Sequence, residues 1–325
     1  MTNIKSKKCK ILNIFYPLLL IVGILLLIIL PQLSIDSFYM GLRIWATKVL
    51  PALLPFFILT RLLSFTSTLN TIGKAFAPIT KKLYGVGGIS GYVFIMSIIS
   101  GYPIGAKLTA DLYKDNAINS KQAQTITAFT STSGPLFIIG TVAIGMYSSQ
   151  VIGILILSSH ILGAMLNGLF YRNKAEITVF NTELRSTSNH LQECMSSSIL
   201  SIMIVGGFIS IFYMFLQIIL QLNTLSPLIR FFEIIGINSS ITKGIIAGLI
   251  EVTTGCLYLE QAEISSKLLL ALSTFLISFG GLSIHAQAYT FLKEFDMPYI
   301  KFLLIKFTQV IISTIIAILL GFIFL

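Results

Sequence analysis

Small polar residues interrupt the apolar stretches of this sequence at four places, and glycine or proline lies at each of them. The four clusters are Ser100-Gly101-Tyr102-Pro103, Thr132-Ser133-Gly134-Pro135, Thr254-Gly255, and Gly280-Gly281 with Ser283 just beyond. Proline removes a backbone donor and glycine adopts conformations closed to other residues, so such clusters break helices. Inside a membrane a break persists only where it is buried in protein or lines a wet cavity. The clusters therefore predict binding sites for a small polar solute, and Lys107, just past the first break, would add a cation.

Each break also has a purely structural interpretation. Ser100 to Gly105 could be a proline kink in a continuous helix, and hydroxyls often bond only to their own helix. Two observations favour binding instead. The first break ends an unusually short apolar segment, and five hydroxyl residues lie between Thr127 and Ser133 around the second break.

Glu251 lies in the otherwise apolar stretch from Gly244 to Gly255. A charged side chain at the bilayer centre costs roughly 2.5–3.5 kcal/mol on insertion scales, so such residues usually face a cavity and have a function. We expect Glu251 to carry a coupling proton or cation, to bind a donor of the solute, or to pair with Lys107. A position near the lipid headgroups is the alternative, because the segment is short.

His285 and Gln287 follow the fourth break. A membrane histidine is often only a hydrogen-bonded structural residue, but His285 follows a double glycine, Gly280-Gly281, in the position equivalent to Gly134-Pro135 of the first half. We therefore expect His285 and Gln287 to bind the solute or relay a proton. His160 and Asn167 lie on a segment without a break, and we expect them to join neighbouring helices.

The composition is that of a helical membrane protein. Of 325 residues, 55% are hydrophobic and 10% charged, with a mean hydropathy of +0.91, whereas soluble chains carry roughly 25% charged residues. Membrane β-barrels use alternating segments of roughly 10 residues, which this sequence lacks. The predicted fold is an all-α polytopic membrane protein with about seven to nine membrane segments. The apolar stretches are 11–30, 44–66, 89–105, 124–147, 150–171, 195–221, 241–257, 268–290 and 302–325.

Four lysines precede the first apolar run, between Lys5 and Lys10. That run has about 20 residues, the length of a membrane helix, whereas a signal-peptide core has roughly 7–15. We expect a retained helix with its N-terminus in the cytoplasm. Cys9, Cys194 and Cys256 are widely spaced and indicate neither a disulfide framework nor a metal site.

The order of long, short and broken segments repeats in two halves. If segments 89–105 and 241–257 both return to the side they enter from, 17 of the 22 Lys and Arg residues lie inside, as the positive-inside rule favours. We therefore expect two inverted repeats with re-entrant or broken helical hairpins. The expected parts are an N-terminal membrane helix 1–38, a first repeat 39–171, a cytoplasmic linker 172–194, a second repeat 195–290 and a C-terminal membrane helix 291–325.

Catalytic and cofactor motifs are missing from the sequence. It contains no His-Glu-x-x-His, Gly-x-Ser-x-Gly or Walker motif and no Cys/His cluster. We expect no enzyme activity, no cofactor and no metal. The net charge is +10, and most Lys and Arg residues lie in the loops between apolar stretches. They form no basic patch that would indicate binding of nucleic acid. The expected partners are the lipid bilayer and a small anion or nucleoside-like solute, and an oligomer is left open.

Taken in order, these motifs resemble the YlbJ family of sporulation integral membrane proteins, which carry a nucleoside-recognition or Gate domain. The resemblance rests on Ser100 to Lys107, Ser133 to Phe137, Glu251 to Gly255, and Phe279 to Gln287. It implies a fold related to concentrative nucleoside transporters. It also implies transport of dipicolinate across the outer forespore membrane, with the chain in a bacterial cytoplasmic membrane. Thr132 stands where the resemblance leads us to expect Asn.

The sequence thus predicts a secondary transporter or facilitator of a small polar solute, with dipicolinate as the first candidate. Hydroxyls and the N-termini of broken helices suit carboxylates, whereas Glu251 would repel a dianion and fits a coupling role better. The alternative is a non-transporting scaffold or assembly factor of the spore envelope. The discriminating observation is whether the breaks line one cavity.

Overall fold

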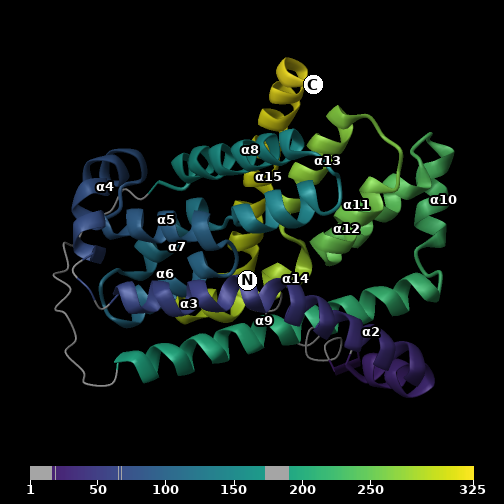
Figure 1. The fold of residues 1–325 in the computed structure, drawn as a ribbon, viewed down its shortest axis with the longest axis horizontal. Helices are drawn as coiled ribbons and strands as arrows, with labels where there is room; N and C mark the ends of the chain where they lie inside the picture. The colour runs from purple at the N-terminus through teal and green to yellow at the C-terminus, as the bar shows by residue number, and fades with distance from the viewer. Residues whose placement is uncertain (1–16, 19, 65, 67, 173–189) are drawn as a thin grey trace, which may run out of the picture.

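The computed structural model describes residues 17–18, 20–64, 66, 68–172 and 190–325 (Figure 1). All regular secondary structure in these ranges is helical, which confirms the predicted helical membrane protein. The N-terminal lysines, expected in the cytoplasm, and most of the expected linker 172–194 lie outside the described residues.

The helices are short wherever the sequence contains a break. After a helix at Leu20–Ile29, the elements are α2 (Pro31–Ile44), η1 (Trp45–Val49), α3 (Leu50–Ser64), α4 (Thr68–Tyr84), α5 (Ile89–Ser100), α6 (Ile104–Lys114), α7 (Ser120–Thr130), η2 (Leu136–Ile144), α8 (Gln150–Phe170), α9 (His190–Gln221), α10 (Ser226–Ile234), α11 (Ser239–Ile250), α12 (Val252–Glu260), α13 (Ser266–Phe279), α14 (Gly281–Leu292), η3 (Lys293–Phe295) and α15 (Tyr299–Phe324).

The helices form layers around the broken segments. On one side α9 packs against α2 and α3, and on the other α8, α13 and α15 pack together (Figure 1). Helices α5, α6 and α7 of the first half lie between these layers, as does α14 of the second. The long outer helices thereby enclose the short ones, whose backbone breaks must be kept away from lipid.

Two pairs of short helices form hairpins. α5 packs against α6 with the break at Gly101 to Pro103, and α11 packs against α12 with the break at Glu251. Gly101 has φ +77°, and a Cβ there would lie 2.4 Å from the Gly134 amide nitrogen. Only glycine allows this backbone conformation and this approach at low cost. The tip of the first hairpin therefore touches the second break.

The structure supports fewer membrane spans than the seven to nine membrane segments that the sequence predicts. Among the described residues, four helices are long and apolar enough to cross a membrane, or six if each of two bent pairs counts as one span. The prediction of seven to nine counted apolar stretches such as 89–105, 124–147 and 241–257 as segments. Each of these contains a break, and hydropathy does not detect a break that leaves the flanking residues apolar.

Close glycine contacts hold the second hairpin together, and they give a test of the fold. A Cβ on Gly255 would lie 2.2 Å from the Gly248 Cα across the hairpin, so Gly255→Ala should destabilise the protein by about 1–3 kcal/mol through overpacking. Gly207→Ala in α9 is the matched control, because nothing lies within 4 Å of its Cβ position. Thermal unfolding in detergent measures both; equal stability of the two variants would contradict the hairpin packing.

Candidate solute-binding site

A cavity of about 150 Å³ lies where the hairpins meet the broken segments. Its polar wall combines residues at or just beyond the four breaks, including Tyr102, Ser133, Thr253 and Ser283. Its apolar wall comes from several helices, with two residues each from η2 (Leu136 and Phe137) and α9 (Val205 and Ile209). The space is far larger than a single water requires, so the cavity can hold a small molecule with one polar and one apolar side.

The structure brings half of the predicted site residues to this cavity. The predicted residues that line it are Ser100, Gly101, Tyr102, Ser133, Gly134, Glu251, Ser283 and Gln287. The predicted residues that do not line it are Pro103, Lys107, Thr132, Thr254, Gly255, Gly280, Gly281 and His285. The residues that do not line the cavity lie at or near the breaks in sequence, but they pack against neighbouring helices. Only one face of each helix borders the cavity.

The backbone carbonyl of Ser131, freed where α7 ends, receives hydrogen bonds from three side chains. The Tyr102 hydroxyl donates to it, and so do Lys306 Nζ at 3.2 Å and Gln309 Nε2 at 3.2 Å. Lys306 Nζ also donates to the Tyr102 hydroxyl and to Gln309 Oε1, at 2.8 Å for the latter. α15 thereby fastens the tip of the first hairpin to the second break.

Lys306 is the important residue that the sequence analysis missed. It is fully buried, although it lies on α15, a candidate membrane span. The signal was present, because a basic residue in the apolar stretch 302–325 is as unusual as a carboxylate in a membrane segment. Tyr102 lines the cavity and Lys306 lies directly behind it, with Nζ 4.8 Å from the centre of the Tyr102 ring.

His160 joins the breaks of the two halves. The Ser133 amide donates to its Nε2 at 2.8 Å, and its Nδ1 lies 2.8 Å from Ser278 Oγ near the end of α13. A backbone N–H can only donate, so Nε2 is the acceptor and the ring proton is on Nδ1, directed at Ser278. Asn167, about two turns further along the same face of α8, donates to the carbonyls of Ala128 and Ile305.

Glu251 forms the N-cap of α12 and lies at the cavity wall. Its carboxylate accepts hydrogen bonds from the Thr253 amide at 3.1 Å and from the Thr254 amide and hydroxyl at 2.8 Å each. The side chain is 6% exposed. In the part of the chain that the structure describes, no basic side chain forms an ion pair with it. The N-terminus of α12 therefore stabilises this negative charge.

His285 forms a hydrogen bond with the backbone at the fourth break and does not line the cavity. Its Nε2 lies 2.9 Å from the carbonyl oxygen of Phe279, and its Nδ1 lies 3.2 Å from the Tyr299 hydroxyl on α15. Gln287, by contrast, lines the cavity and donates to Ser283 Oγ at 3.2 Å. Ser100 also lines the cavity, and its hydroxyl is buried without a hydrogen-bond partner among the described residues.

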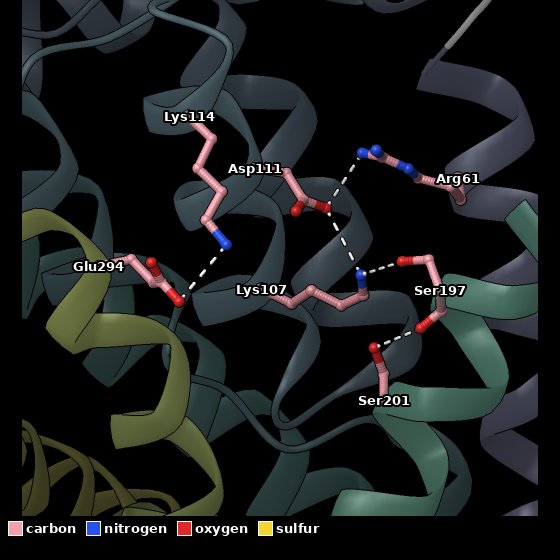
Figure 2. A network of polar contacts seen from close by, with 7 residues as sticks. All are labelled: Arg61, Lys107, Asp111, Lys114, Ser197, Ser201 and Glu294. Carbon is pink, nitrogen blue, oxygen red and sulfur yellow. Dashed lines mark hydrogen bonds and ion pairs between the residues drawn. The ribbon is translucent and has the colours of Figure 1, made fainter. Parts of the chain in front are cut away.

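Lys107 does not pair with Glu251, which corrects one of the predicted roles. It lies 3.5 Å from Asp111 Oδ2 and donates to Ser197 Oγ at 3.2 Å. Figure 2 shows Lys107 and Asp111 on α6 pointing toward Arg61 of α3 and Ser197 of α9. Asp111 is one helical turn after Lys107 and on the same face, so the nearest carboxylate for the lysine is on its own helix. The cluster links the first hairpin to α3 and α9.

Asp111 lies between two basic side chains and pairs with both. Its replacement should therefore lower the stability of the protein. Its Oδ2 lies 3.1 Å from Arg61 Nη1 and 3.5 Å from Lys107 Nζ. Asp111→Asn should lower the free energy of unfolding by about 1–3 kcal/mol, because two mostly buried cations lose their carboxylate. The exposed pair of Lys114 and Glu294 is the control, and Glu294→Gln should cost less than about 1 kcal/mol. Equal shifts in thermal unfolding would contradict this ranking.

The bonds of Lys306 predict energetic coupling with Tyr102. Lys306→Met and Tyr102→Phe each remove the hydrogen bond that joins them, so the double variant should lose less stability than the sum of the single losses. The expected coupling is at least about 0.5 kcal/mol, measured by thermal unfolding of the four proteins. The same cycle with Lys114→Gln in place of Lys306→Met should be additive. Additivity in both cycles would show that Lys306 does not hold the hairpin tip.

Comparisons with known proteins agree with the motifs. Residues 46–150 match the family model Gate, described as nucleoside recognition, and this range contains the first hairpin and the second break. The chain is 29% identical over 307 residues to the sporulation integral membrane protein YlbJ of Bacillus subtilis (strain 168), covering 86% of this chain and 75% of the relative. No solved structure matches. The resemblance inferred from the sequence motifs is confirmed, and the chain is a polytopic helical membrane protein.

Proposed function

We propose that this chain is a secondary transporter or facilitator that carries a small polar solute across a bacterial membrane. The observation that carries the proposal is a single cavity lined by residues at or just beyond each of the four breaks. Breaks in membrane helices are costly unless their backbone groups are satisfied, and a scaffold has no need to gather four of them around one space.

The two halves of the chain are inverted repeats in this proposal, with the boundaries 39–171 and 195–290 expected from the sequence. The order of elements supports it. Each half has a hairpin, then a broken segment, then a long helix: α5–α6, α7–η2 and α8 in the first, α11–α12, α13–α14 and α15 in the second. α8 packs against α15. Rocking of one repeat against the other around a central site is the usual basis of alternating access.

The lining of the cavity favours a solute rich in hydrogen-bond donors. The polar groups that face it are hydroxyls, the Gln287 amide and the Glu251 carboxylate, and no described Lys or Arg lines it. A nucleoside-like solute fits this set, with its ring against the apolar wall. Dipicolinate, which the family resemblance implies, is a dianion and would need a proton or cation at Glu251 to offset the repulsion. Glu251 is thus the proposed coupling residue.

The proposed location follows from the resemblance and from the charge pattern. We place the chain in the bacterial cytoplasmic membrane, and in a sporulating cell in the outer forespore membrane, with the N-terminus in the cytoplasm. The relative named for sporulation supports this location, as does the distribution of Lys and Arg in the sequence.

Uptake by proteoliposomes containing the purified chain tests the function. Radiolabelled uridine and dipicolinate should be supplied separately, with and without an inward proton or sodium gradient. At least one should enter faster than into empty liposomes, and a gradient should raise its accumulation. If neither solute enters under any gradient, exchange condition or pH, the result would contradict the transport proposal and favour the non-transporting scaffold.

Glu251→Gln separates coupling from structure. Gln keeps an oxygen that can cap α12 but carries no charge, so gradient-driven accumulation should fall at least tenfold while solute exchange continues. The cost to stability should be about 0.5–2 kcal/mol, the range for a weakened N-cap. Glu260→Gln, at the exposed end of the same helix, should change neither. Normal accumulation in Glu251→Gln would remove Glu251 from the coupling role.

A further inference from the structure

Helix α10 has an apolar face that the described chain leaves uncovered. Leu228, Phe231 and Ile234 recur at three-residue spacing, which places them on one side of the helix. Phe231 is 57% exposed and Ile234 is 83% exposed, and Ile235 at the end of the helix is also exposed. In a membrane protein, such a face lies against lipid.

The place of α10 in the fold puts this face near the membrane surface. α10 begins at Ser226, shortly after Gln221, the last residue of a candidate membrane span that starts at Cys194. Figure 1 shows α10 at one end of the molecule, running across the direction of α9. A short amphipathic helix that lies across the end of a span typically rests at the boundary between headgroups and acyl chains.

A polar pocket lies on the other side of α10. It has a volume of about 340 Å³, and it is separate from the cavity between the breaks. Its charged residues are Arg230 and Glu233 from α10 and Lys243 from α11. Hydroxyl and amide groups also line it, from Asn223, Ser226, Ser239 and Tyr258, and the apolar residues Leu220, Leu225 and Ile229 complete the wall.

The two basic residues of this pocket are available to a ligand. Within the described ranges, neither Arg230 nor Lys243 forms an ion pair, although Glu233 lines the same pocket. Two cations and one carboxylate leave a net charge of one positive in the pocket. Arg and Lys are the usual partners of phosphate oxygens, and a carboxylate accepts hydrogen bonds from hydroxyl groups.

We infer that α10 and its pocket form a binding site for an anionic phospholipid whose headgroup carries hydroxyls, such as phosphatidylglycerol. The phosphate lies between Arg230 and Lys243, a headgroup hydroxyl donates to Glu233, and the acyl chains follow the apolar face of α10. This site is distinct from the solute cavity, so it stands whether or not the chain transports a solute. Lys243 of α11 and Tyr258 of α12 line the pocket, so a bound lipid would hold the outer part of the second hairpin at the membrane surface.

The test is lipid binding to the purified full-length chain in detergent. Phosphatidylglycerol and phosphatidylcholine with identical acyl chains are titrated separately, and native mass spectrometry gives the fraction of protein with bound lipid. Phosphatidylglycerol should bind at least fivefold more tightly. Arg230→Gln and Lys243→Gln should each weaken it about fivefold, the usual contribution of one basic residue near an anionic membrane surface. Binding of phosphatidylcholine should hardly change.

Matched variants separate charge from folding. Lys267→Gln removes a basic residue that lies over the Phe322 ring, outside the pocket, and should leave lipid binding unchanged. Arg230→Lys and Lys243→Arg keep the charge and should retain most of the affinity. Their thermal unfolding reports whether each variant is folded.

Three results would overturn the inference. They are equal affinities for the two phospholipids, unchanged binding in the folded double variant Arg230→Gln/Lys243→Gln, and displacement of the lipid by inorganic phosphate or glycerol phosphate at concentrations similar to that of the lipid. The last result would assign the pocket to a soluble anion instead.

Discussion

Hydrogen bonds to the backbone groups freed by helix breaks hold this structure together. The carbonyl of Ser131 receives donors from Tyr102, Lys306 and Gln309, and the Ser133 amide binds His160. Lipid offers no hydrogen bonds, so each group would cost several kcal/mol if it were left alone. The partners come mainly from α8 and α15, the long helices that follow the broken segments. These two helices therefore fix where the breaks lie, and the breaks in turn define the cavity.

This arrangement divides the polar groups into two sets. Behind the breaks, side chains such as His160, Lys306 and His285 are occupied with the backbone. In front of them, Ser100, Glu251 and Gln287 line the cavity, and the Ser100 hydroxyl has no partner among the described residues. A solute that enters meets groups already oriented by the fold. Preorganised groups of this kind lose little entropy on binding, which suits a site that must bind and release its solute repeatedly.

The sequence predicted three of the four breaks at the right residues, because glycine and proline act locally on the backbone. The third prediction was displaced: Thr254 and Gly255 lie inside α12, and the chain breaks at Glu251 instead, where the carboxylate caps the helix. The sequence also identified Glu251, since a carboxylate in an apolar stretch is conspicuous. It did not predict partners that are distant in sequence, such as Lys306 for the Ser131 carbonyl, because that contact depends on how α15 crosses the first half. Lys107 was one of the candidate partners considered for Glu251, although Asp111 lies one turn away on the same helix face. The structure supports fewer spans than the predicted number of membrane segments for a related reason, since hydropathy records composition and not the continuity of a helix.

Access to the cavity from each side of the membrane tests the central claim most directly. Single cysteines at Ser100, Ser133, Thr253 and Ser283, in a chain whose own three cysteines are replaced by serine, can be labelled with a membrane-impermeant maleimide in vesicles of known orientation. A transporter that alternates between two states predicts that each position reacts from both sides, and that a transported solute slows labelling at all four. Reaction from one side alone at every position, under every gradient, would contradict the account.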